Sequence, residues 1–395
     1  KLSASALVIM IAAILLWTAN RIMKKIARNK GDLPTPTKPI IKIATNAIVG
    51  VSMITVGALL LAAFPPLGAA LIILGLIISQ SDKIQEFIEN ADIIFSVKMP
   101  DIESIKKMKA EACLIGLLNP YDNHEQLKAL SENNVNAFSM ELVPRSPRAQ
   151  SMDVLSSQSN LAGYKAIVDS SSMFNRAMPM MMTAAGTIAP AKIFIMGVGV
   201  AGLQAIATAK RMGAVVSATD VRRAAGEQCE SLGASFIMVD EEQDSEDSGG
   251  YAKEMSEDYQ KRQSQLIADH LKSQDIVICT ALIPGRPAPT LLTAEMVSSM
   301  KKGSVIIDMA IERGGNCALT EENKTINVGG VNIMGDTNLI SGLAPDASNL
   351  YSRNLYSFLS LFVDLKSDEK LNWEDEIVKA MSIVRDKKIS ENFKK

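Results

Sequence analysis

The sequence is poor in residues that build metal sites and nucleic-acid surfaces. Only two histidines, His124 and His270, occur among 395 residues, which excludes a histidine-based zinc site. The formal net charge of −2 provides no basic surplus, so we expect no nucleic acid partner. The cysteines lie far apart, fit neither a metal spacing nor a disulfide framework, and indicate a reducing compartment: Cys113, Cys229, Cys279 and Cys317. We therefore predict no metal.

Hydrophobic residues make up 47% of the chain and are unevenly spread. The runs at 3–23 and 43–64 are long enough to cross a bilayer as helices, and a shorter run follows at 67–78. A cleaved signal peptide does not fit the first run, because its apolar core is too long and its charges follow it. Buried helices of a soluble protein are the other alternative. We predict that residues 1–80 form a transmembrane anchor of two or three helices in contact with membrane lipid.

The basic residues at 24–30 set the expected orientation of this anchor. Basic loops stay on the cytoplasmic or matrix side, and three crossings would return the chain to that side. The soluble domain would then lie where a nucleotide is available. We therefore expect an integral membrane protein of a bacterial plasma membrane or a mitochondrial inner membrane.

After residue 80, apolar runs typical of strands alternate with segments typical of helices. This alternation favours parallel sheets with crossover helices. The predicted fold class is α/β, with two Rossmann-like parallel-sheet lobes after the all-α anchor. We assign 81–144 plus 346–395 to the first lobe, and 145–345 to a nucleotide-binding domain with its connecting loop and helix. A long helix over 161–182 is expected to bridge the lobes, and another over 348–365 to return to the first lobe.

A glycine motif carries the clearest chemistry. Gly197, Gly199 and Gly202 follow an expected strand and open an expected helix, and Asp220 ends the next strand. The glycines allow a tight turn, a close approach of backbone to a diphosphate, and close packing of helix on strand. The helix N-terminus favours phosphate binding. Asp220 would accept hydrogen bonds from a ribose and repel a 2′-phosphate, which favours NAD over NADP. The neighbouring Arg222 and Arg223 weaken that preference slightly.

Two further segments are candidates for the same site. Residues 145–160 carry many polar side chains between apolar elements, and either line a cleft or form a solvated linker. Residues 280–289 follow an expected strand, at the carboxyl edge where open α/β sheets bind ligands.

Several motifs in order resemble the NAD(H)-binding domain in the alpha subunit of proton-translocating NAD(P) transhydrogenase. The resemblance covers about residues 90–365. The apolar run around 37–60 also resembles a membrane segment of the same enzyme. The matching stretches lie at 148–164, 179–192, 197–214, 249–255, 280–289, 304–310 and 314–317.

The resemblance implies direct hydride transfer between NADH on this chain and NADP⁺ on a separate domain, coupled to proton translocation. It implies NAD(H) as cofactor and a homodimer. The residues at the nicotinamide would be Arg145, Gln150, Asp153 and Ser156. Tyr251 would lie on a mobile loop that closes over the cofactor. The remaining cofactor-binding candidates are Gly197, Gly199, Val200, Ala201, Gly202, Asp220, Val221, Arg222, Gly250, Tyr251, Thr280, Ala281 and Leu282.

The chain also departs from the family pattern. The apolar runs precede the nucleotide-binding domain, and the family's opening strand–helix–strand portion is not found, so we expect a truncated first lobe. The segment 341–348 keeps part of a family loop but lacks a proline and a basic residue. No second nucleotide motif occurs, and the apolar runs contain no histidine, aspartate or glutamate. A partner chain would supply the NADP(H) domain and further membrane helices.

Three functions remain open at this point. The first is the NAD(H)-binding enzyme subunit just described. The second is a catalytically inactive, transhydrogenase-derived structural subunit of a larger, respiratory-type membrane complex. The third is an alanine dehydrogenase, whose chemistry needs a basic group and a histidine near the substrate. Lys98 fits the former, but 117–122 contains no histidine and His124 lies beyond it.

Overall fold

The computed structural model describes residues 88–239, 257–282, 286–363 and 372–394. The predicted anchor over 1–80 and the predicted loop residues Gly250 and Tyr251 lie outside these ranges. Among the described residues, no helix has both the length and the apolar character needed to span a bilayer.

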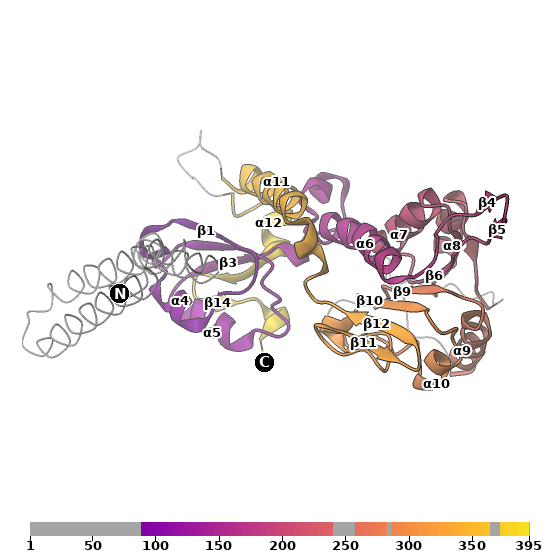
Figure 1. Ribbon diagram of the computed structural model, residues 1–395. Coiled ribbons are helices and arrows are strands. Elements are labelled where there is room, and N and C mark those ends of the chain that lie inside the picture. The colour runs from indigo at the N-terminus through magenta and orange to yellow at the C-terminus, as the bar shows by residue number, and fades with distance from the viewer. Residues whose placement is uncertain (1–87, 240–256, 283–285, 364–371, 395) are drawn as a thin grey trace, which may run out of the picture. The chain divides into compact units, whose positions relative to one another are not determined.

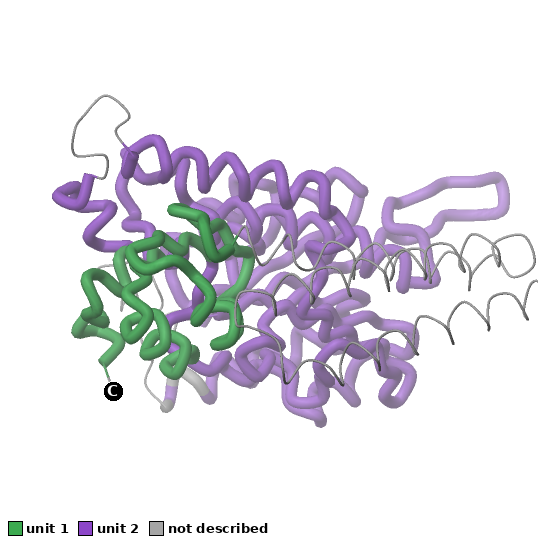
Figure 2. The backbone as a smooth tube through the Cα atoms, turned by 90° about the vertical axis from the view of Figure 1, so that its left-hand side faces the viewer, with its two compact units in different colours: residues 1–116, 122–138, 382–395 green, residues 117–121, 139–381 purple. Residues whose placement is uncertain are grey.

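The chain divides into two units, which Figure 2 shows in different colours. The smaller unit comprises residues up to 116, 122–138 and from 382 onward, and the larger comprises 117–121 and 139–381. The expected boundary differs from this division, because residues 346–381 group with the larger unit. Their helix α11 (Ala344–Phe362) packs on α6 (Val154–Met173). Ser157 Oγ donates to Asn354 Oδ1 at 2.8 Å between these two helices.

The smaller unit contains a five-stranded sheet in the order β1-β2-β3-β13-β14. Its strands are β1 (Ile93–Ser96), β2 (Cys113–Gly116), β3 (Asn136–Ser139), β13 (Ser382–Arg385) and β14 (Lys388–Ile389), with helices α4 (Ile102–Lys107) and α5 (His124–Glu132). The strand β13 pairs antiparallel with β3. Ile383 and Val384 are fully buried, so the C-terminal segment completes this sheet.

The larger unit contains a seven-stranded sheet in the order β11-β12-β10-β9-β6-β7-β8. Its strands are β6 (Lys192–Met196), β7 (Val215–Thr219), β8 (Ser235–Phe236), β9 (Ile276–Cys279), β10 (Val305–Asp308), β11 (Lys324–Val328) and β12 (Val331–Gly335). All neighbours are parallel except β11, which pairs antiparallel with β12 at the edge. The predicted α/β parallel-sheet class is confirmed, although β11 was not expected.

Side chains alternate along β6 between two apolar cores, as a parallel sheet covered on both faces requires. Ile193 and Ile195 join the core beneath α6, α7 (Val200–Arg211) and α8 (Ala224–Ser231). Phe194 and Met196 join the core beneath α9 (Glu257–Leu271) and α10 (Ala294–Ser298). Figure 1 shows α6 and α7 on one side of the sheet and α9 and α10 on the other. This packing fixes the carboxyl ends of the strands at one edge.

The helix predicted over 161–182 begins earlier than expected, at Val154, and the prediction is wrong in its second half. The helix α6 ends at Met173, and an exposed hairpin follows, made of β4 (Met181–Thr183) and β5 (Gly186–Ile188). Pro179 has no backbone N–H to donate and disfavours helical geometry at the residue before it, so the helix does not resume.

Candidate functional site

The glycine motif forms a tight turn between β6 and α7. Gly197 has φ +102°, and a Cβ there would lie 2.6 Å from Thr280 Oγ1. A Cβ on Gly202 would lie 1.9 Å from the Gly197 carbonyl oxygen. The close approach of helix to strand therefore needs glycine at both positions. Gly199 differs, because nothing lies within 4 Å of a Cβ there and its φ of −80° suits any residue. A ligand can therefore approach the backbone at Gly199 closely.

Thr280 fastens this turn to the end of β9. Its backbone N–H donates to the Met196 carbonyl at 2.8 Å, and its hydroxyl donates to the Gly197 carbonyl at 2.9 Å. The predicted residues Thr280 and Ala281 therefore lie directly beside the turn.

Asn316 holds the backbone that follows Thr280. Its Oδ1 accepts from the Ala281 N–H at 3.1 Å, and its Nδ2 donates to the carbonyls of Ala281 and Pro289 at 2.9 and 2.8 Å. Asn316 is fully buried. The stretch 314–317 was singled out from the sequence, but no role was predicted for Asn316. The only signal was an amide side chain directly after two glycines.

Asp308 organises the loop that carries Asn316. This fully buried carboxylate accepts hydrogen bonds from the backbone N–H groups of Ala310, Asn316 and Cys317 and from the Thr320 hydroxyl. The distances lie between 2.9 and 3.1 Å. A buried carboxylate with four donors is satisfied without a cation.

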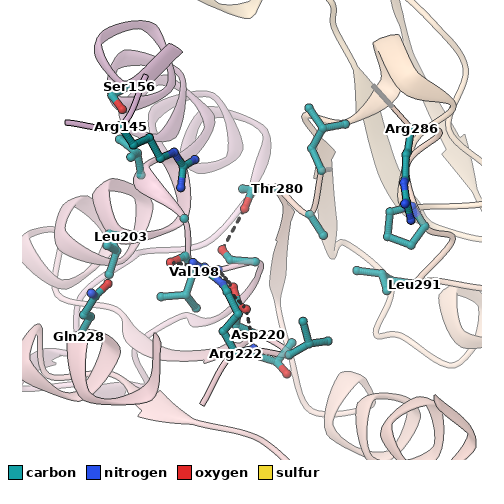
Figure 3. A pocket seen from close by; sticks show the side chains of 18 of the residues that line it. Arg145, Ser156, Val198, Leu203, Asp220, Arg222, Gln228, Thr280, Arg286 and Leu291 are labelled. Atoms are coloured by element: carbon teal, nitrogen blue, oxygen red, sulfur yellow. Dashed lines mark hydrogen bonds and ion pairs between the residues drawn. The ribbon is translucent and has the colours of Figure 1, made fainter. Parts of the chain in front are cut away.

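Asp220 lies at the end of β7, next to the glycine turn, but it has partners within the chain. Its Oδ2 accepts from the Val198 N–H at 2.8 Å. Arg222 binds it with Nε on Oδ1 and an Nη on Oδ2, both at 2.9 Å (Figure 3). From the sequence we expect Asp220 to face a ribose, and this ion pair was not foreseen.

The polar segment 145–160 is ordered as a short helix followed by the start of α6. Residues Pro147–Met152 form a 3-10 helix, and Asp153 caps α6 by accepting from the Ser156 N–H at 2.9 Å. The helix α6 passes very close to α7, since a Cβ on Gly163 would lie 2.1 Å from the Ala201 carbonyl oxygen. This crossing brings the polar segment beside the glycine turn. The structure therefore excludes the alternative that residues 145–160 form a solvated linker.

One cavity of about 1390 Å³ joins the three segments. Ligand sites commonly have about 300–1,000 Å³, so a dinucleotide has room here. Arg145 and Ser156 lie on one side, with Arg286 and Leu291 opposite (Figure 3). The predicted residues that line it are Arg145, Gln150, Asp153, Ser156, Gly197, Gly199, Val200, Asp220, Val221, Arg222, Thr280, Ala281 and Leu282.

Ala201 and Gly202, also predicted, do not line the cavity. The lining residues that were missed include Leu203, Gln228 and Lys261. They come from the three helices α7, α8 and α9, and no local pattern in the sequence distinguishes them. Only the packing of the larger unit places them on one cavity.

The lining favours binding over acid–base or nucleophilic chemistry. It contains four cationic side chains, from Arg145, Arg222, Lys261 and Arg286, and no histidine or cysteine among the described residues. Cys279 lies near the glycine turn, but burial raises the pKa of its thiol well above the usual value, with Asp308 adding to the effect. No group of side chains suited to a metal ion occurs within the described ranges. The cavity can hold phosphates and orient a ligand.

Comparisons with known proteins agree with this architecture. Residues 74–162 match the alanine dehydrogenase/PNT N-terminal domain, and 166–392 match the alanine dehydrogenase/PNT C-terminal domain. A chain of the NAD(P) transhydrogenase alpha subunit of Rhodospirillum rubrum is 51% identical over 76% of this chain and 80% of its own length. A transhydrogenase structure from Sinorhizobium meliloti has 48% identity and a TM-score of 0.70, covering 79% of this chain and 86% of that one.

An alanine dehydrogenase of Staphylococcus epidermidis is more distant, with 29% identity over 60% of this chain and 58% of its own. The resemblance found in the sequence is therefore confirmed, and the chain belongs to the NAD(P) transhydrogenase alpha-subunit family within the alanine dehydrogenase/PNT fold group.

Proposed function

We propose that this chain is the NAD(H)-binding subunit of a membrane transhydrogenase. The cofactor of this family is NAD(H), as the sequence predicted. The proposed reaction is direct hydride transfer between NADH on this chain and NADP⁺ on a partner chain, coupled to proton translocation.

The observation that carries the proposal is the single cavity that joins the glycine turn to the polar segment before α6. The first N–H groups of α7 and the open space at Gly199 would hold the diphosphate. Asp220 would bind the adenosine ribose. At the other end, Arg145, Gln150, Asp153 and Ser156 would orient the nicotinamide.

Bound NAD(H) supplies the hydride, so the protein needs to supply only position and exclusion of water. The absence of histidine and cysteine from the described lining fits this requirement. The cap of Asp153 on α6 fixes the direction of its own carboxylate and of Ser156. These side chains would therefore act by orienting the ring.

The rest of the proposed assembly follows from the sequence. Residues 1–80 would anchor the chain in membrane lipid, with the soluble part on the cytoplasmic or matrix side of a bacterial plasma or mitochondrial inner membrane. The family name of the relatives, subunit alpha, supports a partner subunit that carries the NADP(H) domain and further membrane helices. We also propose a homodimer and a first lobe lacking the family's opening portion.

The binding test is a titration of the full chain with NADH, in which fluorescence reports how much NADH is bound. Gly199→Ala should leave the thermal unfolding temperature unchanged, because nothing lies within 4 Å of the added carbon, and should abolish NADH binding. Gly202→Ala is the contrasting variant, since its Cβ meets backbone at 1.9 Å and should destabilise the fold itself. NADH binding that is unaffected by Gly199→Ala would contradict the proposed site.

The activity test uses membranes with and without this chain, and measures reduction of an NAD analogue by NADPH. Loss of activity on deletion supports the enzyme subunit. Activity that survives deletion supports the alternative, a catalytically inactive structural subunit of a larger complex. An alanine dehydrogenase would instead reduce NAD⁺ with alanine as the hydride donor, without NADPH.

A further inference from the structure

A short helical turn after β10 supports one wall of the cavity from behind. This wall is the stretch 286–291, most of whose residues line the cavity. The backbone carbonyl of Arg313 accepts a hydrogen bond from the Ala288 N–H at 2.7 Å. Arg313 ends the 3-10 helix Ile311–Arg313, in the loop that the buried carboxylate of Asp308 organises. The backbone of Arg313 therefore holds the 286–291 wall to the edge of the sheet.

The side chain of the same arginine contacts a distant segment of the chain. Its Nη2 donates to Asn119 Oδ1 at 2.9 Å, and both residues are half-buried. They lie 194 positions apart in the sequence but belong to the same larger unit. A hydrogen bond from a charged donor is stronger than a neutral one, and more so where water is partly excluded.

Asn119 is itself held in place by Glu141. Its φ of +42° lies in the left-handed region, and its backbone N–H donates to Glu141 Oε1 at 2.8 Å. The Leu118 N–H donates to Glu141 Oε2 at 3.2 Å. Glu141 lies shortly before the stretch 144–156, which forms the wall opposite 286–291 (Figure 3). The contact of Arg313 with Asn119 therefore reaches the segment from which this second wall continues.

We propose that Arg313 is a positioning residue that sets the distance between the two walls of the cavity. Its backbone holds the 286–291 wall through Ala288, and its side chain holds the 144–156 wall through Asn119. This inference rests on the proposed NAD(H) function and adds to that site a residue that does not itself line the cavity.

The two ends of the cofactor should depend on Arg313 to different degrees. The proposed nicotinamide residues lie on the 144–156 wall, so the distance between the walls determines how firmly the ring is held. The diphosphate and the adenosine ribose would bind at the glycine turn and Asp220, which β6, β7 and α7 position. Loss of the Arg313–Asn119 hydrogen bond should therefore loosen the nicotinamide and leave most of the NADH affinity.

The test separates NADH binding from fixation of the nicotinamide ring in the full chain. Asn119→Gly removes the acceptor, and glycine adopts a positive φ without strain. We expect nearly unchanged NADH affinity, but a lower anisotropy and a shorter fluorescence lifetime of the bound NADH. Hydride transfer in membranes should slow by about 10- to 100-fold, the range expected for a misplaced reactant. Asn119→Asp keeps an acceptor and should behave as the wild type.

The same hydrogen bond can be removed from its other end. Arg313→Met removes the donor but keeps the backbone carbonyl that binds Ala288, and it tests the inference independently if Asn119→Gly unfolds. The double variant should be no slower than the slower single variant, because both changes remove one shared bond. Asn323→Gly is the matched control, since Asn323 also has a positive φ and a side-chain hydrogen bond, to Thr337, but does not line the cavity. It should change neither the NADH signal nor the rate.

Wild-type anisotropy and rate in both single variants would overturn the inference and leave the NAD(H) site intact. Effects that simply add in the double variant, or a loss of NADH affinity as large as the loss of rate, would also overturn it. A wild-type chain that fails to bind NADH would instead overturn the proposed function and this inference with it.

Discussion

The contact between α6 and α7 at Gly163 gives a quantitative prediction. A Cβ at this position would lie 2.1 Å from the Ala201 carbonyl oxygen and 2.9 Å from its carbonyl carbon. A Cβ atom rarely lies closer than about 3.0 Å to another heavy atom, whereas the distance here would be 2.1 Å. Gly163→Ala must therefore separate the two helices by the difference, about 0.9 Å. The obstacle is helix backbone, which cannot rotate away as a side chain can.

This separation has two consequences of different size. Overpacking of this kind costs about 1–3 kcal/mol, and the better helix propensity of alanine offsets about 0.5–1 kcal/mol of that. The net loss of unfolding free energy should therefore lie between about 0 and about 2.5 kcal/mol. Function should suffer more, because the shift moves Asp153 and Ser156 away from the glycine turn, and a misplacement of about 1 Å can cost about 100-fold in rate.

The assay combines thermal unfolding with NADH titration and hydride transfer in membranes. Gly226→Ala is the matched control: it is also a buried glycine in a helix, but its Cβ meets the ring of Phe236 at 2.9 Å, which can adjust. We expect Gly163→Ala to lose far more activity than Gly226→Ala at a similar stability. Equal activity of the two variants would refute the idea that this crossing positions the polar segment.

Two further predictions concern buried groups of the larger unit. Asn316→Ala removes three hydrogen bonds that hold Ala281 and Pro289. It should therefore lower the free energy of unfolding by about 1–3 kcal/mol and weaken NADH binding. Unchanged NADH binding in a folded variant would contradict the role given to Asn316. Burial, and secondarily Lys192, lowers the pKa of His270, whose Nε2 lies 2.8 Å from Ser217 Oγ. The unfolded chain therefore binds this proton at higher pH, and stability should fall as the pH drops below about 6.5. Denaturation at about pH 7.5 and about pH 5, on either side of that value, should show the loss in the wild type and a smaller loss in His270→Gln, and identical losses would refute the assignment.

Two of the expectations about secondary structure that the structure corrects share a cause. The helix predicted through residue 182 and the missed strand β11 both lie where local composition is compatible with more than one structure. Apolar methionines at 180–182 suit a helix or a hairpin, and the proline before them decides. The strand β11 is mostly exposed, so no apolar run marks it, and only its pairing with β12 makes it a strand.

The sequence by itself determined the alternation of strands and helices, the glycine turn, and the family. Each of these depends on a local property of the chain: the periodicity of apolar residues, the spacing of glycines, and the order of the motifs. Only the tertiary structure decided that the segment around Asp153 lies beside that turn, that Asn316 holds Ala281, and that Arg222 closes on Asp220. The first two depend on contacts between residues far apart in the sequence. The third depends on side-chain geometry, because the spacing of residues along the chain does not determine the orientation of a guanidinium group.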